Sequence, residues 1–266
     1  MSNADMAARS AHSDVEDQPA RIRLLGGEVD AVTPAAVIAF AEARIRTGRG
    51  AVIANHNLHS LYWLRREPEM ADFYRMADLV EIDSRPLIAW GRWLGHPVGL
   101  EHRATYLDWR EAFWRAAQTD GWRVFQLGGA PGVAEHAAEA LRKRWPGVEI
   151  GVRHGYFELD DPNEAAAVVE TIRDWRPDVL FVGMGMPRQE RWVARHRAAL
   201  PPCVIFTVGA AFDYEAGVTP TPPRWSGRLG LEWLLRFAAE PSRLFSRYFI
   251  EPWSLIGPAL ADLRGR

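Results

Sequence analysis

Cysteine is nearly absent from this chain, which has one residue of this type, Cys203, among 266. A single thiol cannot form an internal disulfide, and it lies in the apolar run CVIFTV, so we expect a buried thiol in a protein of a reducing compartment. No run of about 18 apolar residues occurs, so we expect no membrane-spanning helix. The N-terminus has no apolar segment typical of a secretory signal. The formal net charge of -2 provides no basic excess for nucleic-acid binding.

Motifs of several enzyme classes are missing as well. GGAPG at residues 128–132 resembles a phosphate-binding turn but lacks the full G-x-G-x-x-G spacing, which disfavours an NAD-dependent oxidoreductase. A turn that only packs a helix on a strand is the alternative. His56 and His59 have no Asp, Glu or Cys at ligand spacing, which argues against zinc. The folded region also has no D-x-D element for a metal-bound sugar nucleotide, and we predict neither a metal nor a cofactor.

What the sequence does contain is an alternation of short apolar runs and amphipathic segments. Strands are predicted at residues 51–54, 79–82, 122–127, 148–152, 179–182 and 203–208. Helices are predicted between most of them, which favours an α/β fold with a parallel sheet and right-handed crossovers. Residues 1–20 are polar and acidic and are predicted to be a disordered tail. Residues 210–217 are predicted to be a loop, and the proline-rich TPTPP that follows is predicted to be a stiff linker to C-terminal helices.

The stretch DVLFVGMGMPRQE, residues 178–190, is the most informative part of the chain. It predicts a buried strand that ends at Gly183 and Gly185, followed by a helix with Pro187 in its first turn. Open α/β sheets bind ligands where a strand's carboxyl end meets a helix. Gln189 and Glu190 are then expected at the helix start, beside N–H groups that attract phosphate. The alternative is an ordinary strand-to-helix turn with both side chains on the surface.

Two further strand ends carry polar residues. Asp83 follows the strand at residues 79–82, where a carboxylate can deprotonate a substrate hydroxyl within hydrogen-bond reach. Its alternative role is an N-cap for the next helix. Asn55 and Asn57 follow the strand at residues 51–54 and are expected to hydrogen-bond a substrate or, alternatively, to satisfy the turn itself.

The C-terminal region is rich in arginine and in large apolar residues. The arginines that we propose as a diphosphate-binding set are Arg224, Arg228, Arg236, Arg243 and Arg247. Guanidinium groups at this density can neutralise a diphosphate or anionic lipid heads, and a solvated basic helix face is the alternative. The apolar residues beside them predict an interfacial helix pair at a membrane surface. A homo-oligomer interface that uses the same residues is the competing interpretation.

Taken together, these stretches resemble the WecG/TagA/CpsF family of bacterial glycosyltransferases over residues 22–248. The strongest match is PDVLFVGMGMPRQERW at residues 177–192, which is similar to the family's P-D-hydrophobic-V-G-x-G-x-P-K/R-Q-E-x-W core. FQLGGAPGV and HGYF resemble its central elements. VGAAFDYEAG and GLEWLLRFAAEPSRLFSRY resemble its C-terminal ones. Several independent motifs in the same order make the resemblance specific.

The resemblance implies a Rossmann-like glycosyltransferase domain at residues 21–218 and a membrane-associating helical appendage at residues 219–266. It implies an inverting enzyme, without a required metal, that moves a hexose or N-acetylhexosamine from a UDP-sugar to a polyprenyl-diphosphate-linked sugar. Such enzymes work at the cytoplasmic face of the membrane in exopolysaccharide or cell-wall polymer biosynthesis. A non-catalytic nucleotide-sugar-binding regulator or scaffold on the same fold is the alternative, because fold alone does not determine function.

The resemblance also implies roles for individual residues. Asp83 matches the family's catalytic base, Asn57 the asparagine of its T-x-N motif, and Gln189 and Glu190 its Q-E pair. The residues that match its R-x-T-x-x-D element are Arg103, Thr105 and Asp108. Gly185 and Asp213 lie in matched motifs and complete the predicted substrate-binding set with the five C-terminal arginines.

Three positions depart from the family pattern. The family's threonine is Asn55 here, its Asp-Gly is Asp83-Ser84, and the arginine of its R-A-P is Thr221. The branch that transfers N-acetylmannosamine and the β-glucosyltransferase branch of xanthan-type exopolysaccharide assembly therefore both stay open. The loss of that arginine leaves Arg224 or Arg228 to meet the diphosphate.

Overall fold

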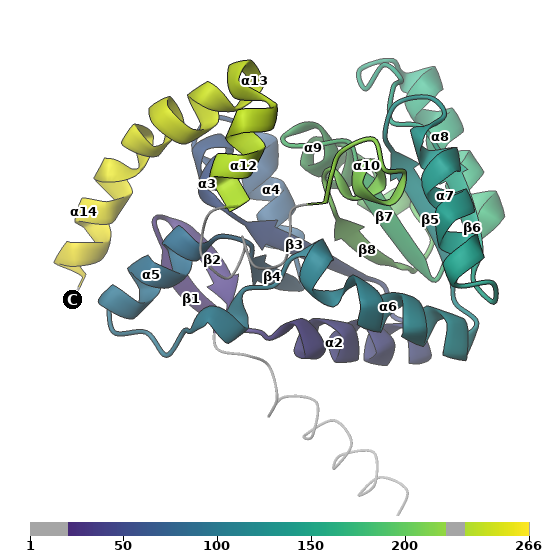
Figure 1. Cartoon of the computed structure of the whole chain (residues 1–266), viewed down its shortest axis with the longest axis horizontal. Helices are drawn as coiled ribbons and strands as arrows, with labels where there is room; N and C mark the ends of the chain where they lie inside the picture. The colour runs from purple at the N-terminus through teal and green to yellow at the C-terminus, as the bar shows by residue number, and fades with distance from the viewer. Residues whose placement is uncertain (1–20, 222–231, 266) are drawn as a thin grey trace, which may run out of the picture.

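A six-stranded parallel sheet forms the centre of the protein. The computed structural model describes residues 21–221 and 232–265, and the sheet has the order β4-β3-β8-β7-β5-β6 (Figure 1). The strands are β3 (Ala51–His56), β4 (Leu79–Ile82), β5 (Arg123–Gly128), β6 (Glu149–Arg153), β7 (Val179–Gly183) and β8 (Val204–Thr207). The α/β fold class and the six sheet strands predicted from the sequence are confirmed. β3 is longer than predicted, so that Asn55 and His56 lie in the strand.

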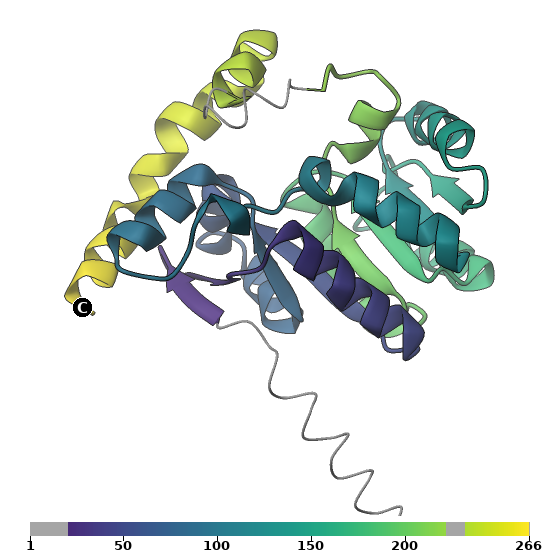
Figure 2. The same cartoon turned by 60° about the horizontal axis from the view of Figure 1, so that its bottom comes forward.

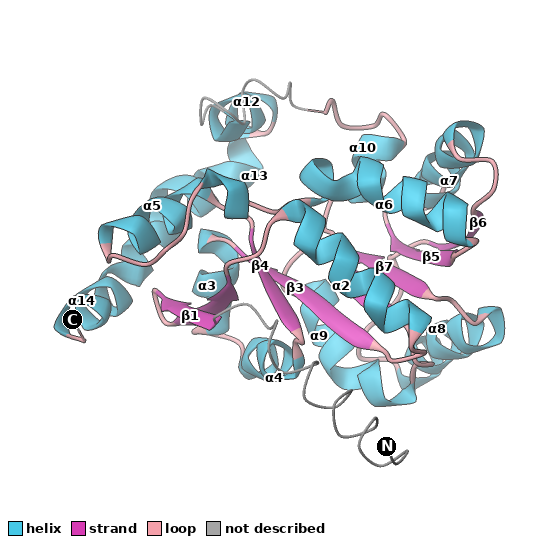
Figure 3. Cartoon of the chain, turned by 90° about the horizontal axis from the view of Figure 1, so that it is seen from below, coloured by secondary structure: helices cyan, strands magenta, loops and turns pink. Residues whose placement is uncertain are grey.

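Helices cover both faces of this sheet (Figure 3). The helices of one face are α2 (Pro34–Arg46), α6 (Tyr106–Asp120), α7 (Val133–Arg144) and α10 (Ala211–Glu215), whose apolar side chains share one core cluster. The helices of the other face, whose apolar side chains share a second core cluster, are α3 (Leu58–Leu64), α4 (Pro68–Met76), α5 (Arg85–Trp93), α8 (Pro162–Trp175) and α9 (Arg188–His196). Strands buried between two helical layers explain the continuous apolar runs of the sequence.

Local sequence signals determine several of these helix starts. Thr33 caps α2 by accepting a hydrogen bond from Ala36 N, with Pro34 in the first turn, as predicted. Asn57 and Ser60 form a reciprocal capping box at the start of α3. The loop predicted at residues 210–217 is wrong: α10 occupies most of it, because Ala211 and Phe212 are apolar enough to bury against the sheet.

Two smaller parts flank the sheet. A hairpin of β1 (Arg21–Leu24) and β2 (Gly27–Asp30) packs against β4, and two short 3-10 helices, η1 (Leu100–His102) and η2 (Arg197–Ala199), precede α6 and follow α9. The C-terminal arm, residues 232–264, consists of α12 (Glu232–Ala239), α13 (Pro241–Phe245), η3 (Ser246–Ile250), η4 (Glu251–Leu255) and α14 (Ile256–Arg264). It runs along one end of the molecule, from above the sheet down to the hairpin and α5 (Figures 1 and 2).

Polar contacts attach this arm to the body of the protein. Asp262 Oδ2 accepts hydrogen bonds from Leu25 N at 2.8 Å and from Trp90 Nε1 at 2.9 Å. Further along the arm, His59 Nδ1 of α3 contacts Glu251 Oε2 at 2.5 Å. No described helix combines the length and the apolar character needed to cross a membrane. The Glu251 contact attaches the arm to α3, and the Asp262 contacts attach it to α5 and to the turn of the β1–β2 hairpin.

Candidate active site

A cleft of about 1100 Å³ opens at the carboxyl ends of the central strands. Its walls include the ends of β3, β4, β7 and β8 and, from the C-terminal arm, residues of α12, α13 and η3. Of the residues predicted from the sequence, those that line it are Asn55, Asn57, Asp83, Thr105, Gly185, Gln189, Asp213 and Arg247. β8 is followed by a helix on one face and its neighbour β3 by a helix on the other, the arrangement in which open sheets form ligand crevices.

Asp83 lies in this cleft directly after β4. Its backbone N–H donates to His56 O at 2.9 Å, which ties it to the end of the neighbouring strand β3. The alternative role as a helix N-cap is wrong, because Ser84 holds that position and accepts a hydrogen bond from Leu87 N. The Asp83 carboxylate is therefore not used as the cap of α5 and lines the cleft.

Asn57 positions this carboxylate. Its Nδ2 donates to Asp83 Oδ2 at 2.9 Å, while its Oδ1 accepts from Ser60 N at 3.0 Å. Because the cap of α3 uses the oxygen, the amide can only present its nitrogen to Asp83. Asn57 is 6% exposed, so the pair is held on a rigid, buried support.

Asn55 braces the floor of the cleft. Its Nδ2 donates to Thr207 O at 2.9 Å, which links the ends of β3 and β8, and its own carbonyl accepts from Tyr74 Oη at 2.8 Å. Tyr74 stacks on the ring of His56, with the ring centroids 3.8 Å apart. Complete burial lowers the pKa of His56 to about 3, so this imidazole is neutral.

The Gln-Glu pair is buried rather than exposed. Gln189 is 1% and Glu190 0% exposed, so the alternative of surface side chains is wrong. Gln189 lines the cleft, accepts a hydrogen bond from Gly209 N at 3.2 Å and donates to Glu190 Oε1 at 2.7 Å. Burial is the largest influence on Glu190 and raises its pKa to about 7. Nearby Gly185 has φ +75°, a conformation that favours glycine and lets the backbone approach a ligand.

Arg103, Thr105 and Asp108 form a unit beside the cleft. Thr105 Oγ1 donates to Asp108 Oδ2 at 2.6 Å, and an Arg103 nitrogen lies 3.7 Å from the same oxygen. Only Thr105 of the three lines the cleft. Ile82 and Arg103 form an isolated parallel bridge, which places this unit next to the end of β4 and Asp83.

The C-terminal arginines are only partly placed. Arg247, in η3, lines the cleft. Arg236 and Arg243 belong to α12 and α13, but their side chains lie outside the described part of the protein, as do Arg224 and Arg228 entirely. Asp213, from α10, also lines this cleft. Among the described residues, no group of three or more His, Cys, Asp or Glu side chains could hold a metal ion.

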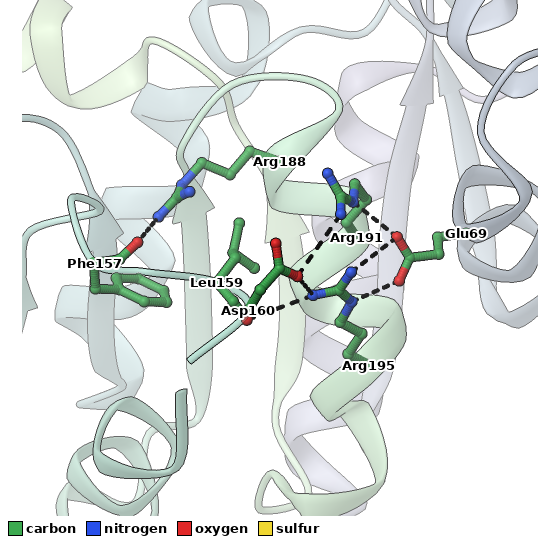
Figure 4. A network of polar contacts seen from close by, with 7 residues as sticks. All are labelled: Glu69, Phe157, Leu159, Asp160, Arg188, Arg191 and Arg195. Atoms are coloured by element: carbon green, nitrogen blue, oxygen red, sulfur yellow. Dashed lines mark hydrogen bonds and ion pairs between the residues drawn. The ribbon is translucent and has the colours of Figure 1, made fainter. Parts of the chain in front are cut away.

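An arginine network secures the loop between β6 and α8, part of which lines the cleft (Figure 4). Arg188 donates to Gly155 O at 3.0 Å and to Phe157 O. Further along α9, Arg195 contacts Asp160 at 2.6 Å. Both Arg191 and Arg195 bind Glu69 of α4. The outer face of α9 therefore connects α4 to the loop that forms one wall of the cleft.

Glu81 is a site residue that sequence reasoning missed. It lies in β4, two residues before Asp83, lines the cleft and is 3% exposed. The sequence contains a feature that indicates this residue: Glu81 is the single carboxylate in an otherwise apolar strand. Its spacing of two residues from Asp83 puts both side chains on the same side of the strand. Only the fold shows that this side of the strand meets a cleft.

Comparisons with known proteins agree with this geometry. The model of the family described as "Glycosyl transferase WecG/TagA/CpsF family" matches residues 22–266. The chain is also similar to the N-acetylglucosaminyldiphosphoundecaprenol N-acetyl-beta-D-mannosaminyltransferases of Staphylococcus aureus strains NCTC 8325 / PS 47, COL and MRSA252. Each is 26% identical over 235 residues, which cover 85% of this chain and 87% of the relative. The match spans the sheet, the cleft and the arm, and the chain belongs to the WecG/TagA/CpsF family of glycosyltransferases.

Proposed function

We propose that this glycosyltransferase moves a hexose or N-acetylhexosamine from a UDP-sugar to a polyprenyl-diphosphate-linked sugar, with inversion, in exopolysaccharide or cell-wall polymer biosynthesis. The observation that carries the proposal is the carboxylate of Asp83, which lines the cleft at the carboxyl edge of the sheet and is held by Asn57. The Staphylococcus aureus relatives, by their names, transfer an N-acetylhexosamine to a lipid diphosphate sugar, which supports the same substrate class here.

In the proposed reaction, Asp83 accepts the proton of the acceptor hydroxyl. The hydroxyl oxygen forms a bond to the anomeric carbon of the donor, while the bond from that carbon to the diphosphate oxygen breaks on the opposite side. The electron pair leaves with UDP, and the configuration at the anomeric carbon inverts. A positioned base contributes roughly 10²–10⁴-fold to such a step.

The rest of the cleft accounts for the donor and for the charge that develops on it. Asn57, Gly185 and Gln189 line the part where we place the UDP-sugar. Arg247 lines the same cleft from the arm, and its guanidinium group is suited to stabilise the leaving diphosphate. We extend this role to the other predicted arginines of the C-terminal region, so that the reaction requires no metal.

We place the protein on the inner face of the cytoplasmic membrane, bound there through its arm. Large apolar side chains are exposed along the arm, among them Phe249 at 45%, Trp253 at 72% and Leu260 at 49%. Such a surface, next to arginines, is suited to the interface of an anionic bilayer, where the lipid-linked acceptor resides. A homo-oligomer formed through the same side chains is the competing interpretation.

A donor screen tests the reaction. The full chain is incubated with UDP-glucose, UDP-N-acetylmannosamine, UDP-N-acetylglucosamine or a UDP-uronic acid, plus a short-chain lipid-diphosphate sugar, and UDP release is measured. We expect one donor to give acceptor-dependent release that persists in EDTA. Binding of a UDP-sugar, shown by a thermal shift, without any UDP release would contradict the proposal and favour a nucleotide-sugar-binding regulator.

A further inference from the structure

A second carboxyl group stands in the floor of the cleft. Glu81 is paired in register with Asn55 across β4 and β3, so the two residues are neighbours on adjacent strands. Its strand neighbour Leu79 belongs to the core cluster that includes Trp109 of α6, whereas Ile82 belongs to the opposite cluster. Glu81 therefore points to the α6 side of the sheet, where the cleft lies.

The contacts of Glu81 leave one of its oxygens for a ligand. Trp109 Nε1 donates to Oε1 at 2.8 Å and fixes the plane of the carboxyl group. The Trp109 ring is 2% exposed and is packed against Phe181 and Phe206, so it cannot follow a displaced partner. Within the described residues, Oε2 has no hydrogen-bond partner, although the side chain lines the cleft.

The surroundings favour the neutral form of this carboxyl group. Burial is the main cause that raises the pKa of Glu81 well above its ordinary value, and the charges of Asp83 at the strand end and Asp108 on α6 act in the same direction. The Trp109 hydrogen bond opposes them with a smaller effect. A protonated carboxyl group both donates and accepts hydrogen bonds, as a sugar hydroxyl does.

We propose that Glu81 is a specificity-determining residue that binds one hydroxyl group of a substrate sugar, beside the hydroxyl that Asp83 deprotonates. This inference rests on the proposed glycosyltransferase reaction. The hydroxyl belongs either to the transferred sugar or to the acceptor sugar, and the two sources are distinguished by which substrate's KM responds to substitution. The site requires a sugar oxygen within reach of Oε2, on the α6 side of β4.

Glu81→Leu and Glu81→Gln test the assignment in the full-length enzyme. Leucine removes the hydrogen-bonding group and should raise the KM of one substrate about 10-fold with little change in kcat, the effect of one lost hydrogen bond at a buried site. Glutamine is neutral, can accept from Trp109 and can donate to the sugar, so its KM should stay near the wild-type value. As the pH rises through the raised pKa of Glu81, the wild-type KM should increase because the carboxyl group ionises, whereas the KM of the glutamine variant should not show this increase.

Deoxy analogues and a structural control complete the experiment. Each hydroxyl of donor and acceptor is removed in turn; for one analogue, wild type and Glu81→Leu should have equal kcat/KM values. Trp109→Phe removes the support of Glu81 but keeps its carboxyl group, and thermal denaturation of all variants reports on folding. The role proposed for Glu81 would be overturned, with the proposed function intact, if the KM and kcat of Glu81→Leu lay within twofold of the wild-type values. It would also be overturned if Glu81→Leu lowered kcat/KM by the same factor for every analogue. A wild-type enzyme that releases no UDP with any donor would overturn this inference together with the proposed function.

Discussion

Asn57 and Asp83 are joined by a hydrogen bond of 2.9 Å between Nδ2 and Oδ2, and the same Asn57 side chain caps α3 through its Oδ1. One amide therefore connects a helix start on one side of the cleft to the proposed base at the end of β4. The two tasks use opposite ends of the amide, so they can be separated by substitution.

Asn57→Asp separates them. Aspartate remains a good N-cap, so the midpoint of thermal unfolding should change little. A second carboxylate beside Asp83 favours retention of a proton by the pair, so the acidic limb of the pH–rate profile should move to higher pH, with lower turnover at neutral pH. The profile is measured by UDP release from pH 5 to 9. An unchanged acidic limb with normal stability would contradict a role for Asn57 in positioning the base.

Asp83→Asn removes the proposed base while it conserves size. Turnover should fall roughly 10²–10⁴-fold, because the acceptor hydroxyl then keeps its proton during attack. The variant should still bind the UDP-sugar, with an affinity measured by calorimetry that is close to the wild-type value. Asp72→Asn, at an exposed aspartate of α4, is the matched control and should leave turnover unchanged. Asp83→Asn activity within a few-fold of wild type would reject Asp83 as the base.

Glu190 makes the stability of the protein depend on pH. Its pKa is about 7 in the folded protein and near its ordinary value of 4.5 in the unfolded chain, so the unfolded chain loses the proton first as the pH rises. The contribution of Glu190 to the free energy of unfolding is fully present below pH 4.5, where the side chain is protonated in both states. It is lost as the pH rises to 7, a decrease of about 3 kcal/mol in the free energy of unfolding.

Glu190→Gln tests this dependence because glutamine does not titrate. Urea unfolding at pH 5 and pH 8 should show a smaller loss of stability in the variant than in the wild type. Glu139→Gln, at an exposed position of α7, serves as the control and should behave as wild type. The same loss of stability in the wild type and in Glu190→Gln would show that Glu190 is ionised in the folded protein near pH 5.

The exposed apolar side chains of the arm should determine membrane binding. Trp253→Glu or Leu260→Glu should lower the partition coefficient on phosphatidylglycerol vesicles roughly 10-fold, the effect of losing one buried apolar side chain. Val218→Glu changes a residue that is also exposed, at 60%, but precedes the arm, and it should have no such effect. Flotation measures partitioning, and sedimentation measures mass. Variants that float like wild type but sediment as smaller particles would favour an oligomer interface.

The sequence was sufficient for the parts of this protein that depend on local pattern. Alternating apolar runs and amphipathic segments predicted the parallel α/β sheet, and Thr33-Pro34 predicted the start of α2, because strand burial and helix capping act over a few residues. The strand-end positions of Asp83 and Gly185 and the helix-start position of Gln189 were also predictable, since polar or glycine residues follow apolar runs. The order of the motifs along the chain was sufficient to indicate the family.

Contacts between distant residues were decided only by the tertiary structure. Asn57 and Asp83 are 26 positions apart and meet because β3 and β4 are neighbours. Glu81 and Trp109 are 28 positions apart and meet because α6 packs on that side of β4. Whether Asp83 or Ser84 caps α5 depended on where the backbone left the strand. Sequence pattern determines which residues are buried and which elements form, but the order of strands in the sheet determines which side chains face one another, and that order follows from packing of the whole chain.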